Sequence, residues 1–304
     1  MEVVNIEKLI NLKNEFAVAI GFFDGVHLGH QLVIKQAVNY AKTDDHIKSV
    51  VITFDRSPKA VLGYADVDDH ITPISEKTRI LEEMGVDYVL VLTFDRTFLN
   101  LSAAAFIEDY LVKMKACYVS VGFDFRFGQG GAGTPALLLS HRGFHVNVSE
   151  SVVMADAKVS TRGIKADLKM GNLDAVHQML GRPFSISGEV IHGRHLGNTI
   201  GFPTANLKLD PGYFFPLRGV YATRSHIDGT SFKSMTNIGM NPTVNTGEMI
   251  SIETYIIDFE ADIYGENLRI EFLDKIRDEI KFSTVDALMI QLEKDKKRVQ
   301  EMTI

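Results

Sequence analysis

The sequence predicts an α/β chain of two domains: a Rossmann-like domain built on a parallel sheet, then a small antiparallel β-barrel closed by one helix. Up to about residue 180, apolar strand-like runs alternate with segments of helical spacing, which is typical of a parallel sheet covered by helices. Beyond Pro183, β-type runs follow one another, and only the last segment has helical spacing. This change of pattern divides the chain into domains 1–182 and 183–304.

The first domain is predicted from its alternating apolar periods. Ser102 is placed to cap a helix, and Gly85 is placed to end one. Because ligands bind beyond the carboxyl ends of parallel strands, the turns at those ends are the first places to look for a site. The predicted strands span residues 16–20, 49–54, 88–94, 118–121 and 144–148, and the predicted helices span 32–41, 75–85, 102–111, 137–139 and 168–180.

The second domain is predicted from short β-type runs broken by turn residues. Asp228-Gly229 separates two of these runs and is a hairpin signal. The predicted strands span residues 187–191, 220–227, 232–238, 251–259 and 268–273, and a last helix spans about 284–299. We therefore expect a small barrel with one helix closing it.

Composition bounds the class of protein. The chain has 304 residues, of which 45% are hydrophobic, enough for two cores of ordinary size. The net charge of −7 disfavours a broad nucleic-acid surface, although a local basic pocket for phosphates stays possible. Cys117 is the single cysteine, so no intrachain disulfide can form and a reducing compartment fits. No signal peptide or membrane-spanning run is apparent, and we expect a cytoplasmic protein.

The stretch GFFDGVHLGH, residues 21–30, lies between a predicted strand and a predicted helix. Such a turn directs backbone N–H groups and the positive end of the helix dipole at a ligand. His27 and His30 are three residues apart and share a face of the first helical turn. Imidazoles there can donate to phosphate oxygens, which indicates a site that stabilises charge on a nucleotide α-phosphate. The alternative is that the histidines cap or pack the turn. The glycine spacing is not that of a dinucleotide fingerprint.

A second glycine cluster, GFDFRFGQGGAG at residues 122–133, follows another predicted strand. A glycine-rich loop at a strand end allows the backbone to approach a ligand closely. A flexible connector would have the same composition. The glycines alone leave these two interpretations open.

Two features of the second domain suggest phosphate chemistry. The segment GRHLGNTIGFPTAN, residues 193–206, brings the hydroxyl of Thr204 and the amide of Asn206 together, and Mg²⁺ accepts such oxygen ligands beside nucleotide phosphates. A turn or a helix cap is the alternative for this pair. Glu253 lies in an apolar strand, where its carboxylate faces either solvent or a working cavity, and strand position alone favours solvent.

Together these motifs resemble one family. In order along the chain they are GFFDGVHLGH, GFDFRFG, LGRPFSISGEVIHG, GFPTANL, GVYAT, NIGMNPT, the strand containing Glu253 that ends in Asp258-Phe259, and IRDEIKF. The chain resembles the bacterial bifunctional riboflavin kinase/FAD synthetase family from about Phe16 to Asp295.

The resemblance implies two reactions. The N-terminal domain would be a nucleotidyltransferase that transfers AMP from ATP to FMN, giving FAD and pyrophosphate. The C-terminal domain would be a kinase that phosphorylates riboflavin with ATP, giving FMN. Mg²⁺ would be the cofactor, and riboflavin, FMN and ATP the partners, with no nucleic acid or membrane. Two alternatives are a riboflavin kinase with a weakened or inactive nucleotide-binding domain, and a non-enzymatic flavin-binding regulatory protein.

The resemblance also implies roles for individual residues. Glu253 would be the base that takes the ribityl hydroxyl proton, and His27 and His30 would stabilise the α-phosphate. Thr204 and Asn206 would hold Mg²⁺ and the ATP phosphates. Nucleotide-binding residues would be Gly21, Phe22, Asp24, Gly25, Ser160, Thr161, Arg162, Lys165, Gly193 and Gly197, and flavin-binding residues would be Gly122, Asp124, Phe125, Phe127 and Arg277.

The sequence departs from the family pattern mainly in its first half. TFDRSP stands at 53–58 where TFxPHP is usual, GQGGAGT at 128–134 lacks the usual basic and acidic residues, and STRGIK stands at 160–165 in place of an SSTRIR-type segment. In the second half, Asn198 and Tyr255 replace a common arginine and histidine. A glycine cannot supply an arginine fork to phosphate, so we expect FAD synthesis to be weak relative to FMN synthesis, with Arg162 and Lys165 sharing the missing role.

Overall fold

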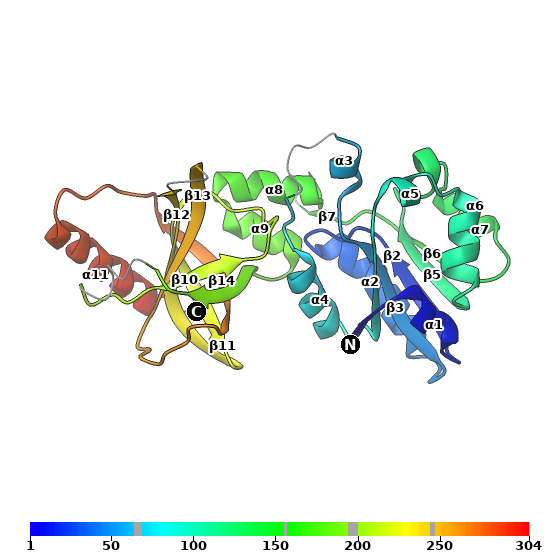
Figure 1. Cartoon of the computed structure of the whole chain (residues 1–304), viewed down its shortest axis with the longest axis horizontal. Coiled ribbons are helices and arrows are strands. Elements are labelled where there is room, and N and C mark those ends of the chain that lie inside the picture. Colours follow the sequence, from blue (N-terminus) through cyan, green and yellow to red (C-terminus); the bar gives the residue numbers. More distant parts are fainter. Residues whose placement is uncertain (64–68, 155–156, 194–199, 244–246, 304) are drawn as a thin grey trace. The chain divides into compact units, whose positions relative to one another are not determined.

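The computed structural model describes residues 1–63, 69–154, 157–193, 200–243 and 247–303 (Figure 1). By its internal contacts the chain divides into two compact units, Met1–Gly163 and Ile164–Ile304. Each unit is described by itself below.

The first unit is built on a parallel sheet of six described strands in the order β1-β4-β3-β2-β5-β6. From β2 the chain adds β3 and β4 on one side, whereas β5 and β6 lie on the other, so the order reverses beside β2. The elements are β1 (Glu2–Val4), α1 (Ile6–Asn11), β2 (Glu15–Ile20), α2 (Leu28–Ala41), β3 (Ile47–Phe54), α3 (Pro58–Val61), α4 (Ile74–Glu83), β4 (Tyr88–Leu92), α5 (Arg96–Leu99), α6 (Ala103–Ile107), the π-helical turn η1 (Glu108–Val112), β5 (Ala116–Gly122), the 3₁₀ turn η2 (Gln129–Gly131), α7 (Pro135–Ser140), β6 (His145–Ser149) and the short hairpin β7 (Val153–Met154) and β8 (Ala157–Lys158).

Side-chain alternation along β2 explains why this sheet is covered on both faces. Phe16, Val18 and Ile20 pack into one core, whereas Ala17 and Ala19 pack into the other. The alanine side lies under α2, whose buried residues recur at helical spacing, and α4 contributes Ile80 and Leu81 to the same core. Because both faces are buried, β2 is an almost continuous apolar run.

The second unit contains a closed antiparallel barrel in the order β10-β13-β12-β11-β14-β9. Helix α11 covers part of its outside and contributes Val299 to an apolar cluster with Val220 and Met235. The elements are α8 (Thr161–Met170), which begins just before the division, α9 (Leu173–Leu180), β9 (Phe184–Ile191), β10 (Ala205–Leu209), β11 (Gly219–Ile227), β12 (Thr230–Thr243), β13 (Gly247–Ile256), β14 (Asn267–Arg277) and α11 (Val285–Glu301).

Inside the barrel, five fully buried hydroxyl groups form one hydrogen-bonded ladder. Its links join Ser225 to Ser234 at 2.8 Å, Ser234 to Thr223 at 2.8 Å, Thr223 to Thr236 at 2.9 Å and Thr236 to Thr254 at 2.9 Å. Each buried hydroxyl therefore has a partner, which offsets the cost of removing it from water.

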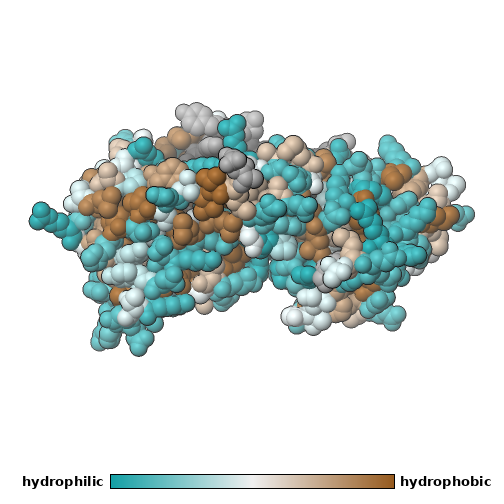
Figure 2. Space-filling view, turned by 180° about the vertical axis from the view of Figure 1, so that it is seen from behind, coloured by the Kyte–Doolittle hydropathy of each residue, from teal (hydrophilic) through white to brown (hydrophobic). Residues whose placement is uncertain are grey.

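These observations confirm the predicted fold class. One predicted helix is wrong: residues 168–180 form two helices, because Gly171 adopts a left-handed φ of 74° and Asn172 caps α9. Helices α8 and α9 precede Pro183 and so fall in the predicted first domain, whereas by internal contacts they belong mainly to the second unit. The face of the molecule in Figure 2 is largely hydrophilic, as expected when apolar faces are buried in cores. In the described part of the chain, no helix has the length and apolar character needed to cross a membrane.

Candidate active sites

The turn between β2 and α2 brings the two predicted histidines together. His27 is the N-cap of α2, and its Nδ1 accepts a hydrogen bond from the backbone N–H of His30 at 3.3 Å. The two imidazole rings are stacked with centroids 3.6 Å apart. Both line a pocket of about 360 Å³, so the capping role and a ligand-facing position coexist in His27.

This pocket lies where the strand order reverses. It is lined by the turn after β2, by residues 122–125 after β5, by 149–152 at the end of β6, and by 158–162. The first three segments follow β2, β5 and β6, which are neighbouring parallel strands, so their carboxyl ends meet at one edge of the sheet. The predicted site residues that line the pocket are Gly21, Phe22, Asp24, His27, His30, Gly122, Asp124, Phe125, Ser160, Thr161 and Arg162.

Two predicted nucleotide-binding residues have other surroundings. The N–H of Gly25 donates to Thr72 Oγ1 at 2.8 Å, behind the turn. Lys165 belongs to the second unit, where its Nζ lies 5.0 Å from the ring centroid of Phe214. In the pocket itself the basic side chains are Lys158 and Arg162. Lys158 was not predicted; its Nζ bonds Asp124 Oδ2 at 2.8 Å.

The electrostatics of the turn keep His30 neutral. Burial, the neighbouring His27 and then Lys77 lower the pKa of His30 well below its ordinary value. His30 Nδ1 is a buried nitrogen that has no hydrogen-bond partner among the described residues. A neutral imidazole carries one donor and one acceptor nitrogen, so a ligand with polar oxygens would satisfy a group that the protein leaves unsatisfied.

The first unit has a second pocket, of about 380 Å³, whose wall is strongly apolar. It adjoins the pocket that His27 and His30 line, because Phe22 and Phe125 line both. The loop Gly128–Gly131 forms part of its wall, so the glycine cluster serves a pocket rather than acting as a bare connector. Gly128 is left-handed, and a Cβ there would lie 2.6 Å from the backbone nitrogen of Ala103. The aromatic residues of this wall are Phe22, Phe54, Phe94, Phe98, Phe106, Phe125 and Phe127.

In the barrel, strand register aligns the predicted kinase residues. Glu253 on β13 stands opposite Asn206 on β10 and opposite Asn237 on β12. Val220 on β11 then pairs with both Asn237 and Arg277. Residues opposite each other on antiparallel strands point to the same side. These five residues therefore form one row on the same side of the barrel wall.

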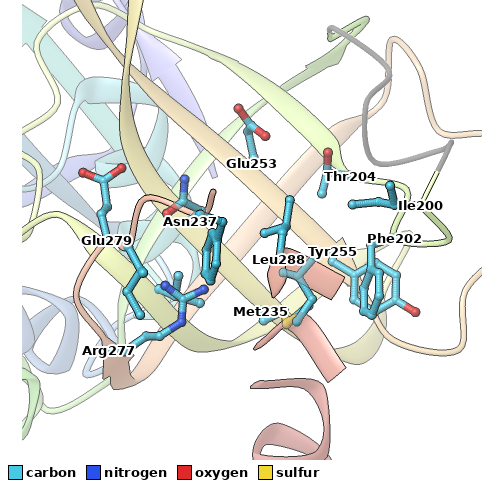
Figure 3. A pocket seen from close by; sticks show the side chains of 14 residues that line it. Ile200, Phe202, Thr204, Met235, Asn237, Glu253, Tyr255, Arg277, Glu279 and Leu288 are labelled. Atoms are coloured by element: carbon cyan, nitrogen blue, oxygen red, sulfur yellow. The ribbon is translucent and has the colours of Figure 1, made fainter. Parts of the chain in front are cut away.

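Four members of this row line a pocket of about 260 Å³ beneath α11 (Figure 3). Glu253 faces this pocket, which decides against the solvent-facing alternative. Figure 3 shows Glu253 and Thr204 near one another at one edge, with Arg277 and Glu279 at another. The remaining wall is mostly apolar and includes Ile200, Phe202, Met235, Tyr255, Ile280, Phe282, Leu288 and Leu292.

Arg277 is held in this pocket from α11. Its Nε donates to Asp295 Oδ2 at 2.9 Å, and Asp295 Oδ1 accepts from Gln291 Nε2 at 2.8 Å. Asp295 is 2% exposed, so this is a buried carboxylate with its charge paired. Asn237 and Glu279 also line the pocket, although neither was predicted to have a role; they lie in the motifs NIGMNPT and IRDEIKF.

Thr204 also lines another pocket, of about 250 Å³, together with Thr254 and the segment 259–264. It therefore stands between two pockets of the barrel. Asn206 Nδ2 donates to the Thr204 carbonyl at 3.4 Å. A Cβ at Gly193 would lie 2.2 Å from that same Nδ2, so Gly193 must be a glycine for the segment to pass Asn206. Gly197 and Asn198 lie outside the described residues.

Comparisons with known proteins agree with this arrangement. A family model for FAD synthetase matches residues 9–163, and one for riboflavin kinase matches residues 180–303. The bifunctional riboflavin kinase/FMN adenylyltransferase of Listeria monocytogenes is 39% identical over 91% of this chain and 89% of its own length. The chain belongs to this bifunctional family. The Escherichia coli K12 member is 36% identical over 93% of this chain and 91% of its own length.

A solved structure from Streptococcus pneumoniae, described as a macrolide-efflux protein, is 34% identical with a TM-score of 0.88, and the match covers 99% of both chains. The comparisons confirm the predicted family and enzyme class. The presence of both enzymatic domains supports the bifunctional interpretation over the kinase-only and non-enzymatic alternatives. Among the described residues of this chain, no cluster of three or more metal-ligating His, Cys, Asp or Glu side chains occurs.

Proposed function

We propose that the barrel unit transfers the γ-phosphoryl group of ATP to the ribityl 5′-hydroxyl of riboflavin, and that the first unit transfers AMP from ATP to the resulting FMN. The observation that carries the kinase assignment is the position of Thr204 between two pockets, with Glu253 in one of them. This arrangement supports binding a nucleotide on one side of Thr204 and the acceptor on the other.

In the barrel, the pocket beneath α11 would hold the flavin, because its wall is mainly apolar and Arg277 offers a fixed donor group. Glu253 would accept the proton of the ribityl hydroxyl as its oxygen forms a bond to the γ-phosphorus. The bond from the γ-phosphorus to ADP breaks, so FMN and ADP are the products. ATP phosphates would lie at Thr204, towards the pocket that contains Thr254.

The oxygen donors of Thr204 and of Asn206, a member of the row, fit a magnesium ion. Thr204 and Asn206 would hold it, since hydroxyl and amide oxygens together with nucleotide phosphates suit this hard cation. When bound, the ion would neutralise charge on the ATP phosphates. Gly193 lies close to the side chain of Asn206, and this contact would hold the Asn206 amide in place beside those phosphates.

In the first unit, ATP would occupy the histidine pocket and the flavin ring the adjoining aromatic pocket. Phe22 and Phe125 line both pockets, so an FMN phosphate would meet the nucleotide where they join. An FMN phosphate oxygen attacks the α-phosphorus, and the bond to the leaving pyrophosphate breaks. His27 and His30 would donate to the oxygens on which negative charge develops. The cytoplasm, which supplies ATP and reducing conditions, suits both reactions.

The test is to incubate the purified chain with riboflavin, ATP and Mg²⁺ and to separate riboflavin, FMN and FAD by chromatography over time. FMN should form first and FAD should follow, and FAD should also form from supplied FMN. Omission of ATP should stop both steps. FMN without any FAD would favour the kinase-only alternative, and no product at all would reject the proposal.

A further inference from the structure

The turn that carries the two histidines is built from left-handed residues. The backbone angle φ is 51° at Phe23, 86° at Gly25 and 41° at Val26. Glycine adopts this region freely, but phenylalanine and especially a β-branched valine do so at a cost in free energy. Such a conformation persists only where surrounding contacts hold it, so the contacts around the turn are informative.

One of these contacts comes from a buried lysine on α4. Lys77 is 2% exposed, and its Nζ donates to the carbonyl oxygen of Phe22 at 2.7 Å and to Thr53 Oγ1 at 3.2 Å. Thr53 Oγ1 in turn donates to the same carbonyl at 3.0 Å. The Phe22 carbonyl and the Phe23 N–H belong to one planar peptide group. Fixing this oxygen therefore restrains the peptide plane on which the backbone angle φ at Phe23 depends.

Thr72, just before α4, holds the next part of the turn. Its N–H donates to Asp24 Oδ1 at 3.1 Å, and its Oγ1 accepts from the N–H of Gly25 at 2.8 Å. Thr72 is 3% exposed, so both bonds are shielded from water. This pair restrains the side chain of Asp24 and the peptide group that joins Asp24 to Gly25, just before the left-handed Val26.

We propose that Lys77 and Thr72 are positioning residues for adenylyl transfer, which hold the strained turn so that His27 and His30 meet the nucleotide in a fixed geometry. The inference rests on the proposed function of the first unit. Neither residue belongs to the described lining of the histidine pocket, so both act through the backbone of the turn. A displacement of catalytic groups by about 1 Å can cost roughly a hundredfold in rate.

Lys77 also acts on His30 through its charge. Its ammonium contributes, after burial and His27, to the lowered pKa of His30. Removal of that charge should raise the pKa of His30 towards its ordinary value. The ring of His27 stacks on His30, and the other charged side chains that line the pocket around it are Asp24, Asp124, Glu150, Lys158 and Arg162.

The experiment compares three variants of the full chain, each with a single substitution. Thr72→Val keeps the side-chain shape but removes the acceptor for Gly25, Thr72→Ser keeps the hydroxyl, and Lys77→Met removes the ammonium. For adenylylation of supplied FMN, Thr72→Val and Lys77→Met should each lower kcat by about 10- to 100-fold, with the KM for ATP within about threefold of the parent. Thr72→Ser should recover kcat to within about threefold of the parent.

Two controls separate positioning from general damage. FMN formation from riboflavin reports the other unit of the same chain and should not change. Lys35→Met removes an exposed lysine from α2 and should leave adenylylation unchanged. In proton NMR titrations, with the His30 signal assigned from His30→Asn, Lys77→Met should raise the midpoint of His30 and Lys35→Met should not.

The inference is overturned if Thr72→Val and Lys77→Met both keep kcat within about twofold of the parent. Equal losses in Thr72→Ser and Thr72→Val, or an unchanged His30 midpoint in Lys77→Met, would also overturn it. A parent chain that forms FMN but no FAD would instead contradict the proposed adenylyl transfer. The positioning inference would then fall as well, because it rests on that function.

Discussion

Two carboxylates line the barrel pocket, and their neighbours distinguish them. Glu253 stands opposite Asn206 in the strand register, beside the oxygen groups proposed to hold the phosphates. Glu279 lies near Gly239, where a Cβ would approach its Oε1 to 2.7 Å, and it shares the Arg277 side of the pocket. The residue beside the phosphate site is the better placed base.

Glu253→Gln should therefore lower the rate of FMN formation by about 10²–10⁴, because an amide keeps the shape but cannot accept the hydroxyl proton. Glu279→Gln is the matched control and should lower that rate less than about tenfold. FAD formation from supplied FMN should persist in both variants. If Glu253→Gln lowers the rate only a few-fold, or if Glu279→Gln lowers it more than Glu253→Gln does, then Glu253 is not the base.

In the first unit, His27→Asn and His30→Asn should each lower FAD formation by about 10²–10³, because each removes a donor aimed at developing charge. FMN formation from riboflavin should keep the parent rate, because these histidines line a pocket of the first unit and the kinase step is proposed for the barrel unit. Both rates are measured on the same protein sample. A parallel fall in both activities would indicate that the substitutions damage the whole chain.

His27 and His30 could be proposed from the sequence because they lie in one short motif. Thr72 and Lys77 could not, because their bonds to the turn join residues 47, 48 and 55 positions apart along the chain. A threonine and a lysine at the start of a predicted helix carry no local signal of such contacts. In the same way, only the strand register shows that Asn206, Glu253 and Asn237 share a row.

At the scale of elements, the segment after β7 supplies cations to the histidine pocket. Arg162, one residue from the altered position at Gly163, lines the pocket. Lys165 lies over the ring of Phe214, whereas Lys158 on β8 lines the pocket and pairs with Asp124. We now propose Lys158 in the role that the sequence prediction gave to Lys165, beside Arg162.

Arg162→Ala and Lys158→Ala should each raise the ATP requirement of FAD formation about 10- to 100-fold, the value of one charge-assisted hydrogen bond. Lys165→Ala is the matched control and should leave this requirement unchanged. The readout is the rate of FAD formation at a series of ATP concentrations. If Lys165→Ala alone raises the requirement, the sequence-based assignment holds and this one fails.

Elements with a strong apolar period were predictable, and elements defined by pairing or by a single backbone angle were not. The alternation around β2, β3 and β4 predicted the parallel sheet because each of these strands is buried. The short β1 has three residues and no period, and it is a strand only because it pairs with β4. The break between α8 and α9 depends on the left-handed Gly171, which an apolar period cannot show.

At the scale of the whole molecule, the open question is where the barrel unit begins. The sequence places the boundary between Arg182 and Pro183, whereas internal contacts place it between Gly163 and Ile164. Helix α9 favours the earlier boundary, because it packs against β9 and β14. The N–H of Leu217 also donates to the Leu168 carbonyl at 2.8 Å, which ties α8 to the segment before β11.

A fragment that starts at Ile164 should fold by itself and form FMN at the rate of the full chain. A fragment that starts at Pro183 should be much less stable, because it loses α9 with its buried Leu173, Val176 and Leu180. Burial of each such side chain stabilises a fold by about 1.5–3 kcal/mol, so the loss approaches the whole stability of a small domain. Urea unfolding of both fragments, with FMN formation as the functional readout, measures this difference. Equal midpoints for the two fragments would place the boundary at Pro183, and an inactive but folded fragment from Ile164 would mean that the kinase depends on the first unit.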